Sequence, residues 1–206
     1  MKFKEALAKF LFQIGISADF LTWLGLCLAL FCGGLIFFGK FFWAGGFLLL
    51  SGFCDLLDGA VARASGKASV FGGILDSSLD RYGDGFVLGA LAVYGAYYHR
   101  LFFSALALVA LLGSFAVSYV RARAECEIES CRVGFWERGE RLVFLALGLL
   151  LNNVLTALLI LAAGTQYTVW QRLSYAQNSR PYPDRRSPSY GWKIAALVFL
   201  ILWLRF

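Results

Sequence analysis

The chain has 206 residues, of which 60% are hydrophobic and only 16% are charged. Its mean hydropathy of +0.69 is that of an integral membrane protein and excludes an ordinary soluble domain. The net charge of +6 suits an anionic membrane surface, so we expect the lipid bilayer as a partner and no nucleic acid.

The apolar runs of the sequence predict an all-α polytopic membrane protein. The first residues, MKFKEALAKF, predict an amphipathic N-terminal helix without a cleavable signal peptide. Six transmembrane helices are then predicted near residues 20–38, 41–62, 72–97, 101–122, 141–152 and 154–171. We expect one transmembrane domain over residues 1–175, followed over 176–206 by a flexible polar linker and a short C-terminal apolar helix.

The positive charges predict the orientation of these six spans. With the N-terminus inside, only Lys40 and Arg100 fall on the outer side, with Lys193 and Arg205 left uncounted beside the terminal run. Every other Lys and Arg then lies on the cytoplasmic side, as the positive-inside rule requires. We therefore expect a multi-pass protein of the cell (inner or plasma) membrane whose N-terminus and active site face the cytoplasm.

Four carboxylates stand out in the predicted second and third spans. Their spacings of three and four residues put each pair on one helix face, so two adjacent helices would bring all four together. Like charges that close require a cation, and oxygen ligands suit Mg²⁺ or Mn²⁺. A salt-bridge set with Arg63 and Arg81 is the alternative, but two Arg supply too little charge for four Asp. The expected metal ligands are Asp55, Asp58, Asp76 and Asp80.

The stretch CDLLDGAVARASGKASVFGGILDSSLDR reads D-x2-D-G-x2-A-R-x8-G-x3-D-x3-D. This spacing resembles the signature of the CDP-alcohol phosphotransferases, with every fixed position present. The resemblance implies an enzyme that couples a CDP-linked alcohol to a second alcohol and releases CMP. It also implies two Mg²⁺ ions per site, with Mn²⁺ possible, and Asp80 as both a metal ligand and the base that deprotonates the acceptor hydroxyl.

The same resemblance implies a site for the CDP-lipid. Gly59 would allow close approach of the nucleotide, although helix packing is an alternative reason for a glycine there. Arg63 offers a planar fork for the diphosphate. The DFLT segment at the entry to the first span resembles a family motif that lines this site, while Asp19 and Thr22 could also simply cap the helix. The expected CDP-lipid residues are Asp19, Phe20, Leu21, Thr22, Gly59, Ala62, Arg63, Ser69 and Gly72.

Arginines on the cytoplasmic side predict a site for a phosphorylated acceptor, because guanidinium groups bind phosphate in a bidentate manner. A membrane-anchoring role for the same charges is the alternative. The motifs SYVRARAE, ERGER and LDSSLDR resemble the family branch that makes phosphatidylinositol phosphate, whereas phosphatidylglycerophosphate synthases tend to have Lys in place of Arg81. The expected acceptor residues are Arg121, Arg138, Arg141 and Arg172.

We therefore predict transfer of the phosphatidyl group of CDP-diacylglycerol to 1D-myo-inositol 3-phosphate. The alternative within the family is sn-glycerol 3-phosphate or another acceptor. A divalent-cation carrier is disfavoured because transport has no need of an Arg fork beside the metals, and a catalytically dead scaffold is disfavoured because the Asp set is intact. Glycine-rich faces in the second and third spans would allow the homodimer that we expect.

Overall fold

The computed structural model describes residues 2–66 and 68–179, and α-helix is the regular secondary structure of this part of the chain. The predicted all-α class is therefore confirmed. The seven helices are α1 (Lys2–Gln13), α2 (Ala18–Phe37), α3 (Phe41–Ala64), α4 (Val70–Tyr97), α5 (Leu101–Ala124), α6 (Arg138–Leu150) and α7 (Val154–Asn178).

Each of the six predicted spans corresponds to one helix, from α2 to α7. The largest difference between the predicted and the observed bounds is at the end of α7. This helix continues to Asn178, so the start of the segment expected to be flexible is helical. Polar residues such as Gln and Ser extend a helix that already has its first turns, and no Pro occurs before Pro181. The rest of the expected linker and the C-terminal apolar helix lie outside the described residues.

Four of the described helices, α2, α3, α5 and α7, are long and apolar enough to cross a membrane. Large apolar side chains such as Phe38 and Leu112 are 74% and 66% exposed, as lipid-facing residues are. Helix α4 is long but carries the acidic motif, and α6 has only 13 residues, which rise about 20 Å against a hydrocarbon core of about 30 Å. The chain is thus a helical membrane protein, and the count of six spans stays a prediction.

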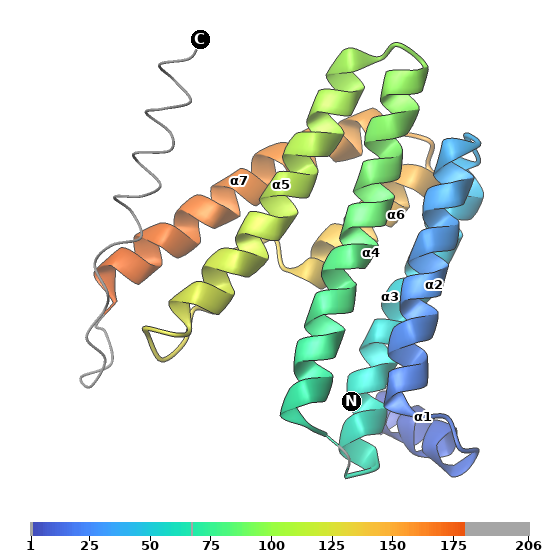
Figure 1. Cartoon of the computed structure of the whole chain (residues 1–206), viewed down its shortest axis with the longest axis vertical. Coiled ribbons are helices and arrows are strands. Elements are labelled where there is room, and N and C mark those ends of the chain that lie inside the picture. Colours follow the sequence, from blue (N-terminus) through green and yellow to red (C-terminus); the bar gives the residue numbers. More distant parts are fainter. Residues whose placement is uncertain (1, 67, 180–206) are drawn as a thin grey trace.

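The helices form a bundle in which α2 packs against both α3 and α4 (Figure 1). Helix α5 packs on α4 and α7, α6 packs on α3 and α7, and α1 lies across the foot of α3. The core joining them is made of fully buried side chains such as Ile36, Leu91, Leu149 and Leu158. Both helices of the acidic motif, α3 and α4, are therefore held by the same core.

A glycine allows α6 to lie very close to α3. A Cβ on Gly45 would stand 2.8 Å from the carbonyl oxygen of Ala146 and 2.9 Å from the backbone nitrogen of Leu150. No side chain fits between these two backbones, and the close approach fixes where α6 lies along α3. Since α6 begins at Arg138, the packing brings this arginine to the acidic motif.

Candidate functional site

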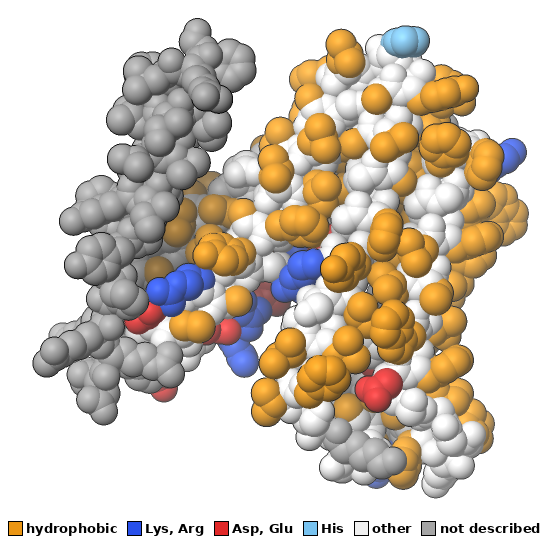
Figure 2. Space-filling view, in the orientation of Figure 1, with side chains coloured by type: hydrophobic (Ala, Val, Ile, Leu, Met, Phe, Trp, Pro, Cys, Tyr) orange, Lys and Arg blue, Asp and Glu red, His pale blue; other side chains and the backbone are white. Residues whose placement is uncertain are grey.

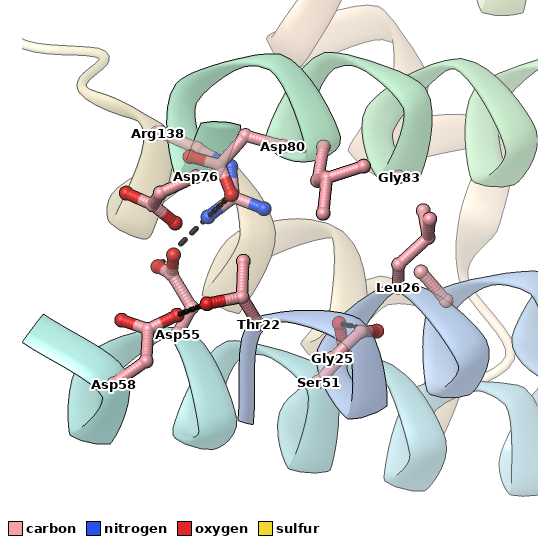
Figure 3. Close-up of a pocket in the computed structure, with 12 residues that line it drawn as sticks. Thr22, Gly25, Leu26, Ser51, Asp55, Asp58, Asp76, Asp80, Gly83 and Arg138 are labelled. Carbon is pink, nitrogen blue, oxygen red and sulfur yellow. Dashed lines mark hydrogen bonds and ion pairs between the residues drawn. The ribbon is translucent and has the colours of Figure 1, made fainter. Parts of the chain in front are cut away.

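Three carboxylates from two helices converge near the cytoplasmic end predicted for the bundle. Oxygens of Asp55 from α3 and of Asp76 and Asp80 from α4 all lie within 4.8 Å of one another (Figure 3). The helical spacings explain the convergence, because Asp76 and Asp80 are one turn apart on the face of α4 that looks toward Asp55. The structure therefore brings together three of the four carboxylates that the sequence singled out.

Asp58 lies beside this group and is fixed by a hydrogen bond from another helix. Its Oδ2 accepts from the Oγ1 of Thr22 in α2 at 2.9 Å, and the residue is only 5% exposed (Figure 3). The hydroxyl of Ser17, which accepts from the backbone N–H of Phe20 at 3.2 Å, caps α2. Ser17, and neither Asp19 nor Thr22, is therefore the residue that caps α2. The hydroxyl of Thr22 instead orients the motif carboxylate of Asp58.

The carboxylate cluster fits a divalent cation. The Oδ1 of Asp76 is buried and has no hydrogen-bond partner among the described residues. A buried carboxylate oxygen without a donor is costly unless a cation satisfies it. Convergent carboxylate oxygens are the ligands that Mg²⁺ and Mn²⁺ prefer.

An arginine from α6 reaches into the cluster. The Nη1 of Arg138 lies 2.7 Å from the Oδ2 of Asp55 and 2.9 Å from the Oδ1 of Asp80 (Figure 3). The arginine is placed by the start of its helix, where Glu137 and Glu140 form a capping box. Of the two arginines considered from sequence, Arg81 contacts Asp80 at 3.6 Å, and none of the ion pairs in the described chain involves Arg63.

A pocket of about 630 Å³ opens on one side of the cluster and contains most of the residues predicted for the CDP-lipid. Phe20 and Leu21 do not line it, because neighbouring residues of a helix point about 100° apart. Phe20 is exposed, and Leu21 packs in a small core with Leu57 and Val61. The predicted residues that do line the pocket are Asp19, Thr22, Gly59, Ala62, Arg63, Ser69 and Gly72, beside Asp58 and Asp76.

A second pocket, of about 430 Å³, is lined by residues of α4, α5, α6 and α7, and it contains all the predicted acceptor residues. Figure 2 shows Lys and Arg side chains gathered in the hollow between α4 and α5. The arginines that line it are Arg81, Arg121, Arg138, Arg141 and Arg172, with Ser118, Glu125 and Glu137 between them. The first pocket thus adjoins the cluster through Asp58 and Asp76, and the second adjoins it through Arg138.

These arginines differ in how firmly they are held. The Nε and Nη1 of Arg172 donate to the carbonyl oxygens of Val133 and Val117 at 2.9 and 2.6 Å, and the residue is 2% exposed. Arg121 pairs with Glu125 at 3.1 Å and Glu137 at 3.8 Å. Partial burial raises the pKa of Glu125, but the hydrogen bonds from Arg121 and the Cys131 N–H outweigh it and leave the pKa lowered. Glu125 therefore stays ionised beside its arginine at neutral pH.

Asp84 pairs with two arginines of α6. It lies one turn beyond Asp80, and its oxygens are 3.8 Å from the Nε of Arg138 and 3.6 Å from the Nη2 of Arg141. Arg141 also donates to the carbonyl oxygen of Trp136 at 2.9 Å. Both partners of Asp84 are more than fifty residues away along the chain, so local sequence spacing could not identify them. The sequence also missed Arg81, which the motif LDSSLDR contains, as a residue of the second pocket.

Comparison with known proteins identifies the family of the chain. A family model described as CDP-alcohol phosphatidyltransferase matches residues 16–171. The archaetidylinositol phosphate synthase of Methanothermobacter thermautotrophicus is 36% identical over 79% of this chain and 84% of its own. The phosphatidylinositol phosphate synthase of Mycobacteroides abscessus is 32% identical over 86% of this chain and 85% of its own.

Solved structures show the same fold. The phosphatidylinositol phosphate synthase of Mycobacterium tuberculosis with CDP-DAG bound has a TM-score of 0.79 and 28% identity, covering 91% of this chain and all of that one. The same enzyme in complex with manganese and citrate also has a TM-score of 0.79, with 29% identity over 89% of this chain and 93% of that one. The chain belongs to the CDP-alcohol phosphatidyltransferase family and is a transferase.

Proposed function

We propose that the protein transfers the phosphatidyl group of CDP-diacylglycerol to 1D-myo-inositol 3-phosphate and releases CMP. The observation that carries the proposal is the pair of pockets that adjoin the carboxylate cluster, one of them lined by five arginines. Relatives named phosphatidylinositol phosphate synthase and archaetidylinositol phosphate synthase support the choice of acceptor.

The larger pocket suits the nucleotide and the diphosphate. Gly59, Gly72 and Gly73 leave its walls open to close approach of a ligand, and Arg63 supplies a cation at its edge. Asp58 and Asp76 line both this pocket and the cluster, so a diphosphate bound here would reach the metal ligands. We assign Asp55, Asp58, Asp76 and Asp80 as those ligands. When bound, the divalent ions would neutralise the diphosphate and the leaving CMP.

Asp80 is the residue we assign as the general base. It lies where the cluster meets the arginine-lined pocket, in contact with both Arg138 and Arg81. Its carboxylate would take the proton of the acceptor hydroxyl as the hydroxyl oxygen attacks the β-phosphorus of CDP-diacylglycerol. A new P–O bond then forms to the acceptor as the P–O bond to CMP breaks, and CMP leaves with the electron pair.

The arginine-lined pocket suits an acceptor that carries its own phosphate. A phosphomonoester has nearly two negative charges at neutral pH, and charge-assisted contacts to guanidinium groups are among the strong hydrogen bonds of proteins. An uncharged alcohol would leave these cations without a partner from the substrate. We also propose that this pocket faces the cytoplasm, where a soluble phosphorylated acceptor is available.

Product analysis with a panel of acceptors tests the proposal. Purified protein would be given labelled CDP-diacylglycerol and, in separate reactions, inositol 3-phosphate, sn-glycerol 3-phosphate or free inositol, and the lipid products separated by thin-layer chromatography. We expect turnover with inositol 3-phosphate to exceed both others. Faster turnover with glycerol 3-phosphate would refute the inositol assignment and leave only the family reaction.

A further inference from the structure

Arg81 differs from the other arginines of the arginine-lined pocket in how it is positioned and held. It follows Asp80 directly in α4, and its side chain lines the pocket together with Arg121 of α5 and residues at the start of α6. The side chain is 36% exposed, the highest value among the pocket arginines whose ion pairs are described above. Figure 2 shows the hollow between α4 and α5 into which basic side chains project.

The buried arginines of this pocket are committed to the protein itself. Arg172 donates through two nitrogens to backbone carbonyls, and Arg141 donates to one carbonyl and pairs with Asp84. They are 2% and 5% exposed, respectively. Breaking these bonds to bind a ligand would leave buried carbonyl oxygens without a donor, which is costly. These two arginines therefore hold the walls of the pocket in place.

Arg81, in contrast, is held through one nitrogen of its guanidinium group only. Its Nη1 donates to the carbonyl oxygen of Ser77, one turn earlier in α4, at 2.9 Å. The same nitrogen is 3.6 Å from the Oδ2 of Asp80. A guanidinium has five N–H donors in a planar fork, so this anchoring leaves several donors for a ligand. The hydrogen bond to Ser77 also orients the fork before a ligand arrives.

We propose that Arg81 is a direct ligand of the acceptor's phosphate group, an inference that rests on the function proposed above. Arg81 and Arg121, on the packed helices α4 and α5, are the most exposed arginines of the pocket. Arg121 is already paired with Glu125 and Glu137, which leaves Arg81 as the cation available to a doubly charged phosphate. Because Arg81 also contacts Asp80, it sets the distance between the bound phosphate and the base. A hydroxyl at a suitable distance from that phosphate is then presented to Asp80, which makes Arg81 a determinant of acceptor choice.

Steady-state kinetics of two substitutions test the inference. Arg81→Ala removes the fork, and we expect KM for inositol 3-phosphate to rise about 10- to 150-fold, as for the loss of a charge-assisted contact, while KM for CDP-diacylglycerol stays within about twofold. Arg81→Lys keeps the charge without the planar fork, so its KM for inositol 3-phosphate should lie between that of the unaltered protein and that of Arg81→Ala. The matched control is Arg123→Ala, because Arg123 lies on α5 outside the pocket and pairs with Glu127 at 2.7 Å. Both of its KM values should equal those of the unaltered protein.

Stability is measured alongside the kinetics. A melting temperature and a CMP-induced stabilisation equal to those of the unaltered protein would show that Arg81→Ala leaves the fold and the nucleotide pocket intact. If turnover of Arg81→Ala is too slow for kinetics, calorimetric titration with inositol 3-phosphate replaces KM. An unchanged KM or Kd for the acceptor would overturn the inference, and so would an equal rise of both KM values.

The same variants separate this inference from the proposed function. If the unaltered protein prefers glycerol 3-phosphate, the inositol assignment fails, and KM for glycerol 3-phosphate then tests Arg81. A rise of that KM in Arg81→Ala alone would support the phosphate contact. An unchanged value would overturn it.

Discussion

Substituting Gly45 tests whether the close packing of α3 and α6 supports the site. A Cβ at this position would be 2.8 and 2.9 Å from backbone atoms of Ala146 and Leu150, which no side-chain rotation can relieve. The two helices would have to separate by about half an ångström to reach normal contact, and overpacking of this kind costs about 1–3 kcal/mol. Because α6 carries Arg138 and Arg141, their guanidinium groups would move with it. We therefore expect Gly45→Ala to lower stability and also to raise KM for the acceptor.

Gly46→Ala is the matched control, because a Cβ on Gly46 meets nothing within 4 Å. Replacing a helical glycine by alanine should itself stabilise α3 by about 1 kcal/mol in both variants, so their difference isolates the overpacking. The melting temperature of Gly45→Ala in detergent should be roughly 2–12 °C below that of Gly46→Ala. Equal melting temperatures, with equal acceptor KM, would refute the reasoning about this contact.

Three further predictions concern the site itself. EDTA should abolish transfer and added Mg²⁺ or Mn²⁺ should restore it in the same assay, whereas full activity in the chelator would refute the metal assignment. Asp55→Asn and Asp80→Asn should each lower kcat by roughly 100-fold or more, with partial rescue by high metal only for Asp55→Asn; near-normal turnover of Asp80→Asn would refute its role as base. Arg172→Met should lower the melting temperature as well as weaken acceptor binding, because the carbonyl oxygens of Val117 and Val133 lose their donor; an unchanged melting temperature would contradict its structural role.

Local spacing predicted much of this site. Carboxylates three or four residues apart share a helix face whatever the surrounding fold, so the convergence of Asp55, Asp76 and Asp80 followed from sequence once α3 and α4 were expected to be neighbours. The apolar runs likewise predicted the helices α2 to α7, since long apolar segments in a membrane protein have few alternatives to a helix.

Contacts between distant segments could not be predicted in this way. The position of Arg138 between Asp55 and Asp80 depends on how α6 packs on α3, and nothing in the ERGER motif encodes that register. The sequence analysis also assigned one shared role to four arginines, whereas the structure shows Arg172 bound to backbone carbonyls and Arg81 lining the same pocket. Hydrophobicity indicates which part of a helix is buried but not where the helix ends, so α7 continues beyond its apolar run.

The most direct test of the proposed reaction follows the acceptor's phosphate. Inositol 3-phosphate with a radiolabelled phosphate would be incubated with unlabelled CDP-diacylglycerol, and the label measured in the lipid fraction while released CMP is quantified. If the acceptor's hydroxyl attacks and its phosphate serves only for recognition, label should enter the lipid in equal amount to the CMP released, even with equimolar unlabelled glycerol 3-phosphate present. Release of CMP while the label stays in the aqueous fraction would contradict the account.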